Sequence, residues 1–225
     1  MYNIAVILAA GNGTRMEMDK SKMLLEIGGK TVLERSVEAF SELPEIDEII
    51  VVCRECDIEV FSELLDEEIT FVIGGGTRQQ SVMNAVETID ECDYILVHDG
   101  ARPLVTQKAI INTLDKAQMY NAAATGVAVK DTLKIVDEDL SIVGTPNRNN
   151  LVSIQTPQIF SFNLYKKALE KAVQNKKDYT DDCQLVENFG EKVYVVLGDY
   201  DNIKITTKSD IPLAENILKM RGEME

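Results

Sequence analysis

IAVILAAGNGTRM, residues 4–16, is the stretch that decides the fold of this chain. Its first seven residues are apolar, which is typical of a strand buried on both faces of a parallel sheet. Small residues and glycines follow, and their backbone amides can surround a phosphate because no bulky Cβ blocks the approach. Arg15 and Lys22 come soon after, at the strand's carboxyl end, where open α/β sheets bind ligands. The stretch therefore predicts a polyphosphate-binding loop.

Two familiar nucleotide-binding motifs are excluded. A dinucleotide-binding fingerprint needs a third glycine for close helix–strand packing, and Met16 stands at that position. Residues 29–31 read Gly-Lys-Thr, like the end of a P-loop, but Leu24 occupies the place of its first glycine. We interpret residues 28–29 as a tight turn and residues 31–34 as a Thr-x-x-Glu capping box that begins a helix.

The composition is that of an ordinary globular protein with a core. The 225 residues are 45% hydrophobic and 27% charged, which fits a single α/β domain over residues 1–225. No apolar run reaches the length of a membrane span, and the chain enters a strand without a signal-peptide region, so we expect a cytoplasmic protein that binds no membrane. The net charge of −15 argues against nucleic-acid partners. An acidic protein that binds phosphates must gather its cations locally and recruit a divalent metal.

The cysteines and the single histidine offer little catalytic chemistry. Cys53 and Cys56 form a C-x-x-C without a second pair or a nearby histidine, which argues against zinc and favours reduced thiols. His98 is the only histidine and directly precedes Asp99. We interpret its imidazole as structural, although it is the one base available for a Ser-His or Cys-His pair.

Strands and helices alternate along most of the chain, which favours a Rossmann-like three-layer α/β sandwich with a mostly parallel sheet. We expect strands at 3–10, 47–53, 69–73, 93–98, 122–129 and 192–197. We expect helices at about 31–42, 56–66, 78–88, 107–120 and 161–175, and further helices from Thr180 and Ser209. Thr77 with Gln80 predicts a second capping box, and Thr106 predicts an N-cap.

Residues 131–150 break this alternation. They read as two short strands around an Asp-Glu-Asp turn, and a lone hairpin is marginally stable in water. It must pack against the body or another chain, so we predict an oligomerisation arm.

Polar residues gather where predicted strands end. Asp99 follows the fourth strand at the ligand-binding edge, where it suits Mg²⁺, or alternatively caps its loop by pairing with Arg102. Residues 74–78, Gly-Gly-Gly-Thr-Arg, offer amides to an anion or a base edge, or form a plain tight turn. Asp201 and Lys204 lie at the start of a predicted short strand near the carboxyl end of the chain.

At this point the motifs are recognisable together. Leu-Ala-Ala-Gly-x-Gly-x-Arg-Met is followed by Lys22, Val-His-Asp-Gly-Ala-Arg-Pro, Val-Lys-Asp-Thr-Leu-Lys, Gln-Thr-Pro-Gln and Asp-Asn-Ile-Lys-Ile-Thr, over roughly residues 3–218. The chain strongly resembles the 2-C-methyl-D-erythritol 4-phosphate cytidylyltransferase family of the sugar-nucleotidyltransferase superfamily. The nearest related family, ribitol-5-phosphate cytidylyltransferase, typically has Asp-Ser-Val-Arg-Pro at residues 99–103. Where the family usually has Pro-Lys-Gln, this chain has Ser-Lys-Met at 21–23, and Lys20 is a second candidate for the lysine's role.

The resemblance implies an enzyme that transfers the cytidylyl group of CTP to 2-C-methyl-D-erythritol 4-phosphate, with Mg²⁺, in non-mevalonate isoprenoid synthesis. The catalytic residues would be Arg15, Lys22, Arg148 and Lys204. Mg²⁺ would be held by Asp99, with help from Asp201. The substrates would be bound by Ala9, Ala10, Gly11, Gly13, Gly75, Ser81, Arg102, Thr132, Thr156 and Thr180. In the family the arm reaches across a homodimer, so Thr132 and Arg148 would serve the partner's site.

Two other functions compete with this expectation. The same fold and site would serve transfer to ribitol 5-phosphate, which changes only the acceptor. A non-catalytic nucleotide-binding module would also keep the fold, but such proteins tend to lose charged residues that this chain retains.

Overall fold

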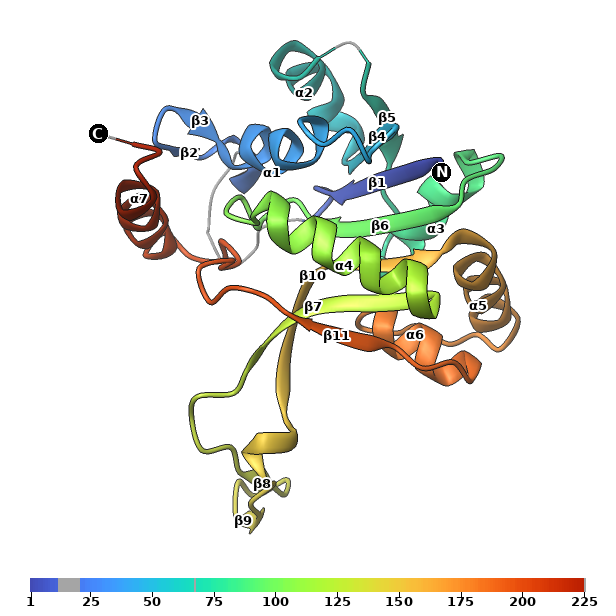
Figure 1. The fold of residues 1–225 in the computed structure, drawn as a ribbon, viewed down its shortest axis with the longest axis vertical. Helices are drawn as coiled ribbons and strands as arrows, with labels where there is room; N and C mark the ends of the chain where they lie inside the picture. The colour runs from blue at the N-terminus through green and yellow to red at the C-terminus, as the bar shows by residue number, and fades with distance from the viewer. Residues whose placement is uncertain (12–20, 67, 225) are drawn as a thin grey trace.

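The computed structural model describes residues 1–11, 21–66 and 68–224, and its centre is a seven-stranded sheet in the order β11-β7-β10-β6-β1-β4-β5 (Figure 1). The strands are β1 (Asn3–Leu8), β4 (Glu48–Cys53), β5 (Thr70–Ile73), β6 (Tyr94–Asp99), β7 (Ala122–Ala128), β10 (Val152–Ser161) and β11 (Tyr194–Leu197). All neighbouring pairs are parallel except those made by β10, which runs antiparallel to both β6 and β7. The predicted mostly parallel sheet is confirmed.

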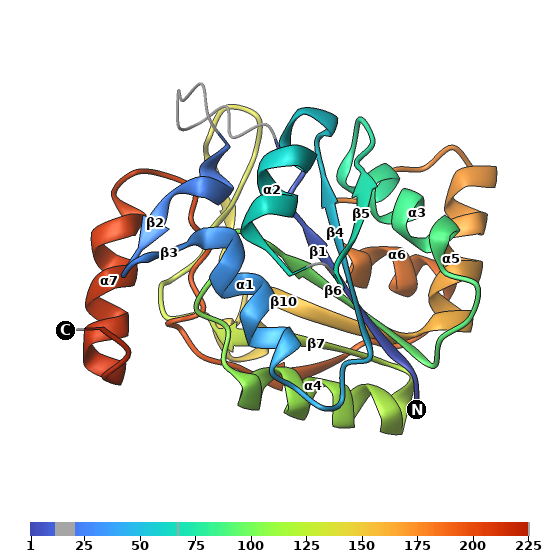
Figure 2. The same cartoon turned by 90° about the horizontal axis from the view of Figure 1, so that it is seen from above.

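Helices cover both faces of the sheet, as the three-layer prediction requires (Figure 2). In β1 the alternating side chains divide between two cores: Ile4 and Val6 face one, and Ala5 and Ile7 face the other. The second core is closed by α1 (Val32–Ser41), α2 (Ile58–Leu64), α4 (Gln107–Tyr120) and α7 (Asp210–Arg221). The first is closed by α3 (Arg78–Thr88), α5 (Phe162–Gln174) and α6 (Asp182–Phe189).

No helix in the described part of the chain is long and apolar enough to cross a membrane.

Most of the turns and helix caps that the local sequence predicts are present in the structure. Gly28 and Gly29 have φ of +58° and +77° and join β2 (Glu26–Ile27) to β3 (Lys30–Thr31). Thr31 and Glu34 form the complete capping box of α1, and Thr106 caps α4.

The second capping box is only half formed. The hydroxyl of Thr77 accepts from the backbone N–H of Gln80, as predicted. The side chain of Gln80, however, accepts from Gly76 N at 3.0 Å instead of returning to Thr77. The open glycine loop before the helix offers a nearer amide, so the box was predicted wrongly in its second half.

The longest difference from the prediction is β10, for which no strand was expected. Its centre is Gln-Thr-Pro-Gln, residues 155–158, a polar, proline-containing run that locally resembles a loop. In the structure Gln155, Thr156 and Gln158 are all buried, and the pairing with β7 shifts its register between Ile154 and Gln158. Long-range polar contacts, described below, replace the apolar pattern that would have indicated a strand.

Residues 131–150 extend from the body between β7 and β10 (Figure 1). Within them β8 (Ile135–Val136) pairs antiparallel with β9 (Ile142–Gly144). Large apolar side chains on this arm face solvent, among them Leu140 at 80% and Ile142 at 64% exposure.

Candidate active site

A cavity of about 400 Å³ lies at the carboxyl ends of β1, β4, β5 and β6. The described residues that line it come from the ends of these strands and from two lysine-bearing segments: Leu8, Ala10, Gly11, Lys22, Met23, Cys53, Arg54, Gly74, Gly75, Gly76, Thr77, Arg78, Ser81, Asp99, Ala101 and Lys204. This is the edge at which open α/β sheets bind ligands. Predicted site residues from four separate motifs therefore meet at one cavity.

The glycine loop after β5 forms one wall of the cavity, and its close packing excludes side chains. A Cβ on Gly74 would lie 2.4 Å from the Cβ of Ala10, and one on Gly75 would lie 2.4 Å from that of Gln80. Ser81 fixes the loop, because its Oγ accepts from Gly75 N at 3.1 Å and donates to Thr77 O at 2.9 Å. The loop presents backbone, the surface that can read a base edge or an anion.

Ala9 lies directly behind this surface. It is buried, and its N–H donates to Val52 O at 2.7 Å instead of facing the cavity.

Asp99 is the one carboxylate among the described lining residues, and three cations surround it. Lys204 Nζ lies 2.7 Å from Oδ2, Arg102 Nε lies 3.7 Å from Oδ2, and Arg78 Nε lies 3.7 Å from Oδ1. Burial raises the pKa of Asp99, but the three cations outweigh it and hold that pKa well below its usual range. Asp99 is therefore ionised at neutral pH. The sequence left open whether Asp99 lies at the ligand-binding edge or pairs with Arg102. In the structure it does both.

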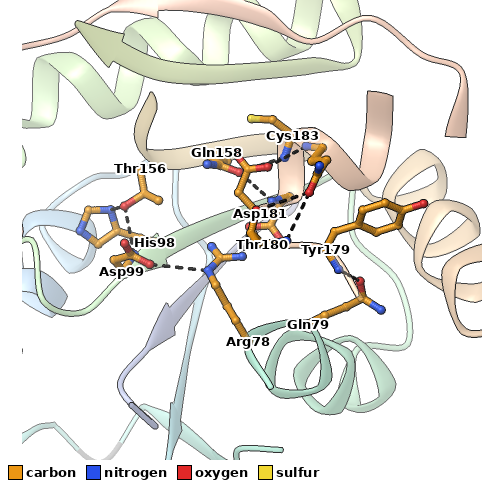
Figure 3. Close-up of polar contacts among 12 residues, drawn as sticks. Arg78, Gln79, His98, Asp99, Thr156, Gln158, Tyr179, Thr180, Asp181 and Cys183 are labelled. Atoms are coloured by element: carbon orange, nitrogen blue, oxygen red, sulfur yellow. Dashed lines mark hydrogen bonds and ion pairs between the residues drawn. The ribbon is translucent and has the colours of Figure 1, made fainter. Parts of the chain in front are cut away.

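Arg78 is a site residue that the sequence analysis did not single out. Its Nη1 lies 2.7 Å from Asp182 Oδ2. Since its Nε also faces Asp99 (Figure 3), the guanidinium bridges the two carboxylates. Burial lowers the pKa of Arg78, and the two carboxylates more than reverse this. Asp182 in turn accepts from the buried Tyr165 hydroxyl. The available signal was the position of Arg78 directly after the glycine run, but its partner lies 104 residues away in sequence.

The segments that carry the cations are tied to one another. Lys22 Nζ donates to Ile205 O at 3.1 Å, and Ile205 N donates to Ala101 O at 2.7 Å. Arg102 Nη1 donates to Asn202 O at 2.7 Å. The short strand predicted at Lys204 is not formed, because these isolated bonds replace a ladder. Arg102 thus lies behind the cavity as a brace and is absent from the lining.

Three other predicted residues also lie outside the lining. Asp201 is half exposed, and the contact described for its carboxylate is Arg221 Nη2 at 3.9 Å. Thr156 is buried, and its hydroxyl bonds to Asp99 N and to His98 (Figure 3). Thr180 is exposed and donates to Gln184 Oε1 at 3.4 Å.

The segment that bears Thr180 is fastened to α3. The side chain of Gln79 accepts from Tyr179 N at 3.0 Å (Figure 3). It also donates to Lys177 O at 3.0 Å. Gln158 Oε1 accepts from Asp182 N and Cys183 N, each at 3.1 Å. Thr180, predicted to bind substrate, therefore lies between two segments that hydrogen bonds fix in place.

The remaining predictions fall on other parts of the chain. Gly13, Arg15 and Lys20 lie outside the described residues. Thr132 and Arg148 lie on the exposed arm, where Arg148 Nη1 donates to Lys130 O at 2.9 Å.

His98 and the buried cysteines Cys53 and Cys92 carry no ionisable chemistry near neutral pH. Burial lowers the pKa of His98 to about 4, so its fully buried imidazole is neutral. Burial raises the pKa of Cys53 to about 11 and that of Cys92 to about 12. The four cysteines are unpaired, and no cluster of three or more His, Cys, Asp or Glu occurs among the described residues.

Comparison with known proteins gives a uniform result. The family model described as IspD, 2-C-methyl-D-erythritol 4-phosphate cytidylyltransferase, matches residues 3–220. Proteins of that name from Clostridium perfringens and Caldanaerobacter subterraneus are 44% and 46% identical; each match spans 96% of this chain and 98% of the relative. Among solved structures, 4-diphosphocytidyl-2C-methyl-D-erythritol synthase from Anaerococcus prevotii has a TM-score of 0.87 at 38% identity, covering 97% of this chain and 96% of that one. The cytidylyltransferase from Thermus thermophilus has a TM-score of 0.80 at 31% identity, covering 97% and 100%.

Proposed function

Since this chain belongs to the 2-C-methyl-D-erythritol 4-phosphate cytidylyltransferase family, we propose that the cavity beside Asp99 is where it performs that family's reaction. The chain is an enzyme that transfers the cytidylyl group of CTP to 2-C-methyl-D-erythritol 4-phosphate, and it belongs to the non-mevalonate route to isoprenoid precursors. The observation that carries the placement is the meeting of glycine-loop amides, Lys22, Lys204 and an ionised Asp99 around one cavity.

CTP contacts two sides of the cavity: one binds the base and ribose, and the other binds the triphosphate. The base and ribose lie against Ala10, Gly75 and Ser81, where exposed backbone offers donors and acceptors without side chains in the way. The triphosphate lies between Gly11, which follows β1, and Lys22, both of which line the cavity. Arg15 belongs to the same loop in sequence and adds a second cation.

The chemistry needs no general base. A sugar monophosphate is largely dianionic near pH 7, because its second pKa is about 6. Its oxygen attacks the α-phosphorus in line, the new P–O bond forms, and pyrophosphate leaves with the electrons of the broken bond. Catalysis is then positioning and charge stabilisation, which Lys22 and Arg15 supply at the phosphates. The neutral, buried His98 fits a reaction without proton abstraction.

The residues present fit a magnesium ion that enters with the nucleotide. Mg²⁺ is usually held by one or two carboxylates together with substrate phosphates, and the described cavity offers the single ionised carboxylate of Asp99. When bound, the ion would neutralise charge on the phosphates. Asp99 is the residue that would hold it, and Asp201, the predicted helper, lies outside the cavity lining.

Asp99 and the acceptor phosphate compete for the positive charge of Lys204. Lys204 now pairs with Asp99 at 2.7 Å, and this side chain can turn to an incoming phosphate once Asp99 has another cation. Arg148 and Thr132 would reach the acceptor from the partner in a homodimer. The arm's exposed apolar side chains and its extension from the body support this assembly (Figure 1).

We also propose that residues 1–225 form one nucleotidyltransferase domain with this arm. A cytoplasmic location is supported by four unpaired cysteines, since disulfides are rare in that compartment.

The deciding experiment measures Mg²⁺-dependent pyrophosphate release from CTP with 2-C-methyl-D-erythritol 4-phosphate and, in parallel, ribitol 5-phosphate. We expect release with the first and little with the second. The reverse preference would keep the site and change the acceptor, and no release with either would overturn the placement. A titration of Mg²⁺ into the protein with and without CTP tests the metal, which should bind only with the nucleotide.

A further inference from the structure

We propose that His98 is a positioning residue: two hydrogen bonds of fixed direction let its imidazole hold both ends of the turn that presents Asp99 to the cavity. This inference rests on the proposed role of Asp99. It assigns a function to the only histidine of the chain, which the reaction itself does not use.

The imidazole is enclosed on all sides. His98 is fully buried on β6, and its ring lies against Phe40 of α1 with ring centroids 4.9 Å apart. Nδ1 lies 3.0 Å from Thr156 Oγ1 (Figure 3). Nε2 lies 3.2 Å from Arg102 O. Both ring nitrogens therefore have protein partners.

The partners fix the position of every hydrogen. Arg102 O is a carbonyl and can only accept, so Nε2 must carry the hydrogen that it receives. Thr156 Oγ1 already accepts from Asp99 N at 3.0 Å, and its own hydrogen then donates to an unprotonated Nδ1. With a hydrogen on Nδ1, the threonine hydroxyl would lose this acceptor in a buried place, which is costly. The Nε2–H tautomer is the arrangement that satisfies all four groups.

These hydrogen bonds form a series of fixed direction that holds the turn from Asp99 to Arg102 in place. It runs from Asp99 N–H to Thr156 O–H to His98 Nδ1, and His98 Nε2–H continues to Arg102 O. Arg102 N closes the turn by donating to Asp99 O at 2.9 Å. Arg102 also donates to Asn202 O, two residues before Lys204. Reversing or breaking the chain should thus misplace both the Asp99 carboxylate and the lysine opposite it.

The direct test is nitrogen-15 NMR of the imidazole in tag-free protein. Because the chain has a single histidine, the ring signals need no assignment. We expect a hydrogen-bearing Nε2 and an unprotonated Nδ1 at pH 7.5, without any ligand. An Nδ1–H tautomer, or a mixture of the two, would overturn the proposal, and this measurement requires neither a variant nor activity.

Variants test the consequence for catalysis. Thr156→Val removes the central hydroxyl, and we expect kcat to fall and the Mg²⁺ concentration for half-maximal rate to rise, each by about 10-fold or more, as for other groups that orient a metal ligand. KM for CTP should change little, because the base-binding wall is a separate segment. Thr156→Ser keeps the hydroxyl and should recover most of the loss. Thr113→Val, which removes another buried threonine hydroxyl on α4, is the matched control.

Variants of His98 test the hydrogen bonds of its two ring nitrogens one at a time. His98→Asn keeps an acceptor near Nδ1, and His98→Gln keeps a donor near Nε2, so we expect each to retain part of the activity that His98→Leu loses. If Thr156→Val matched Thr113→Val in kcat and Mg²⁺ dependence, the positioning role would be wrong. If the natural protein released no pyrophosphate, the proposed function would fail whichever tautomer is found.

Discussion

Arg78 at the cavity and Arg148 on the arm show two opposite ways in which this chain holds a charged side chain. Arg78 is largely buried between the carboxylates of Asp99 and Asp182, and its contacts join α3 to β6 and α6. Arg148 is exposed, and the hydrogen bond described for its side chain goes to the nearby backbone of Lys130. Contacts between residues far apart in sequence organise the cavity. The contacts described for the arm join it to itself and to the residues where it leaves the body. The described walls of the cavity are therefore held by contacts within one chain, whereas the arm is the part for which we propose a partner chain.

The strongest way to test the cavity half of this comparison is Lys22→Ala. Lys22 lines the cavity, and its proposed role is to stabilise charge that develops on the phosphates, so we expect kcat to fall about 10²–10³-fold. The melting temperature should change little, because the side chain is only partly buried. Steady-state pyrophosphate release and circular dichroism give both values. Near-normal turnover would contradict the assignment and move the role to Lys20.

A mixing experiment tests whether the two regions work across subunits. Lys22→Ala and Arg148→Ala should each be nearly inactive alone. If the arm serves the partner's site, a mixed dimer has one site with both residues intact, and a random mixture should recover about a quarter of natural activity in a symmetric dimer. The measurement is pyrophosphate release after the two variants are mixed and allowed to exchange subunits. No recovery after proven exchange would place Arg148 in its own chain's site.

The arm alone is tested by Ile142→Asp. Ile142 is 64% exposed, and a charge there should prevent burial against a second copy. We expect light scattering to show half the natural mass, with an unchanged melting temperature for the body. Val60→Asp is the matched control, because this equally apolar residue is exposed on α2. If the natural protein were already monomeric, the proposed homodimer would be wrong.

The smallest effect concerns the pH dependence of stability in the cavity region. Burial lowers the pKa of His98 from 6.5 to about 4, so the unfolded chain binds a proton at a pH where the folded chain does not. Stability from this group is complete above pH 6.5 and is lost as pH falls toward 4. Between pH 6.5 and 5.5 the natural protein should lose roughly 1 kcal/mol more than His98→Gln. Urea unfolding at the two pH values measures this, and equal losses would refute it.

The sequence predicted those parts of the molecule whose causes are local. The apolar run of β1, the turn at Gly28 and Gly29, and the capping box from Thr31 each depend on a few consecutive residues, and all were predicted correctly. The comparisons confirm the family that the motifs indicated.

The missed features depend on distant partners. β10 was not predicted because Gln155, Thr156 and Gln158 are polar, and they are buried only because other segments supply their hydrogen bonds. The Arg78–Asp182 pair joins residues 104 positions apart, and no local pattern indicates it. The sequence also placed Arg102 and Thr156 among substrate contacts, whereas the structure uses both to brace the Asp99 turn.

The pairing of β7 with β10 has a folding consequence. Val152 is the register partner of Ala128, so the arm leaves and re-enters the sheet at adjacent positions. An insertion with its ends already together adds little closure entropy, and its length affects that cost only weakly. The body can therefore complete its fold before the arm orders. A change in the length of the arm therefore leaves the pairing of β7 with β10 beneath it in place.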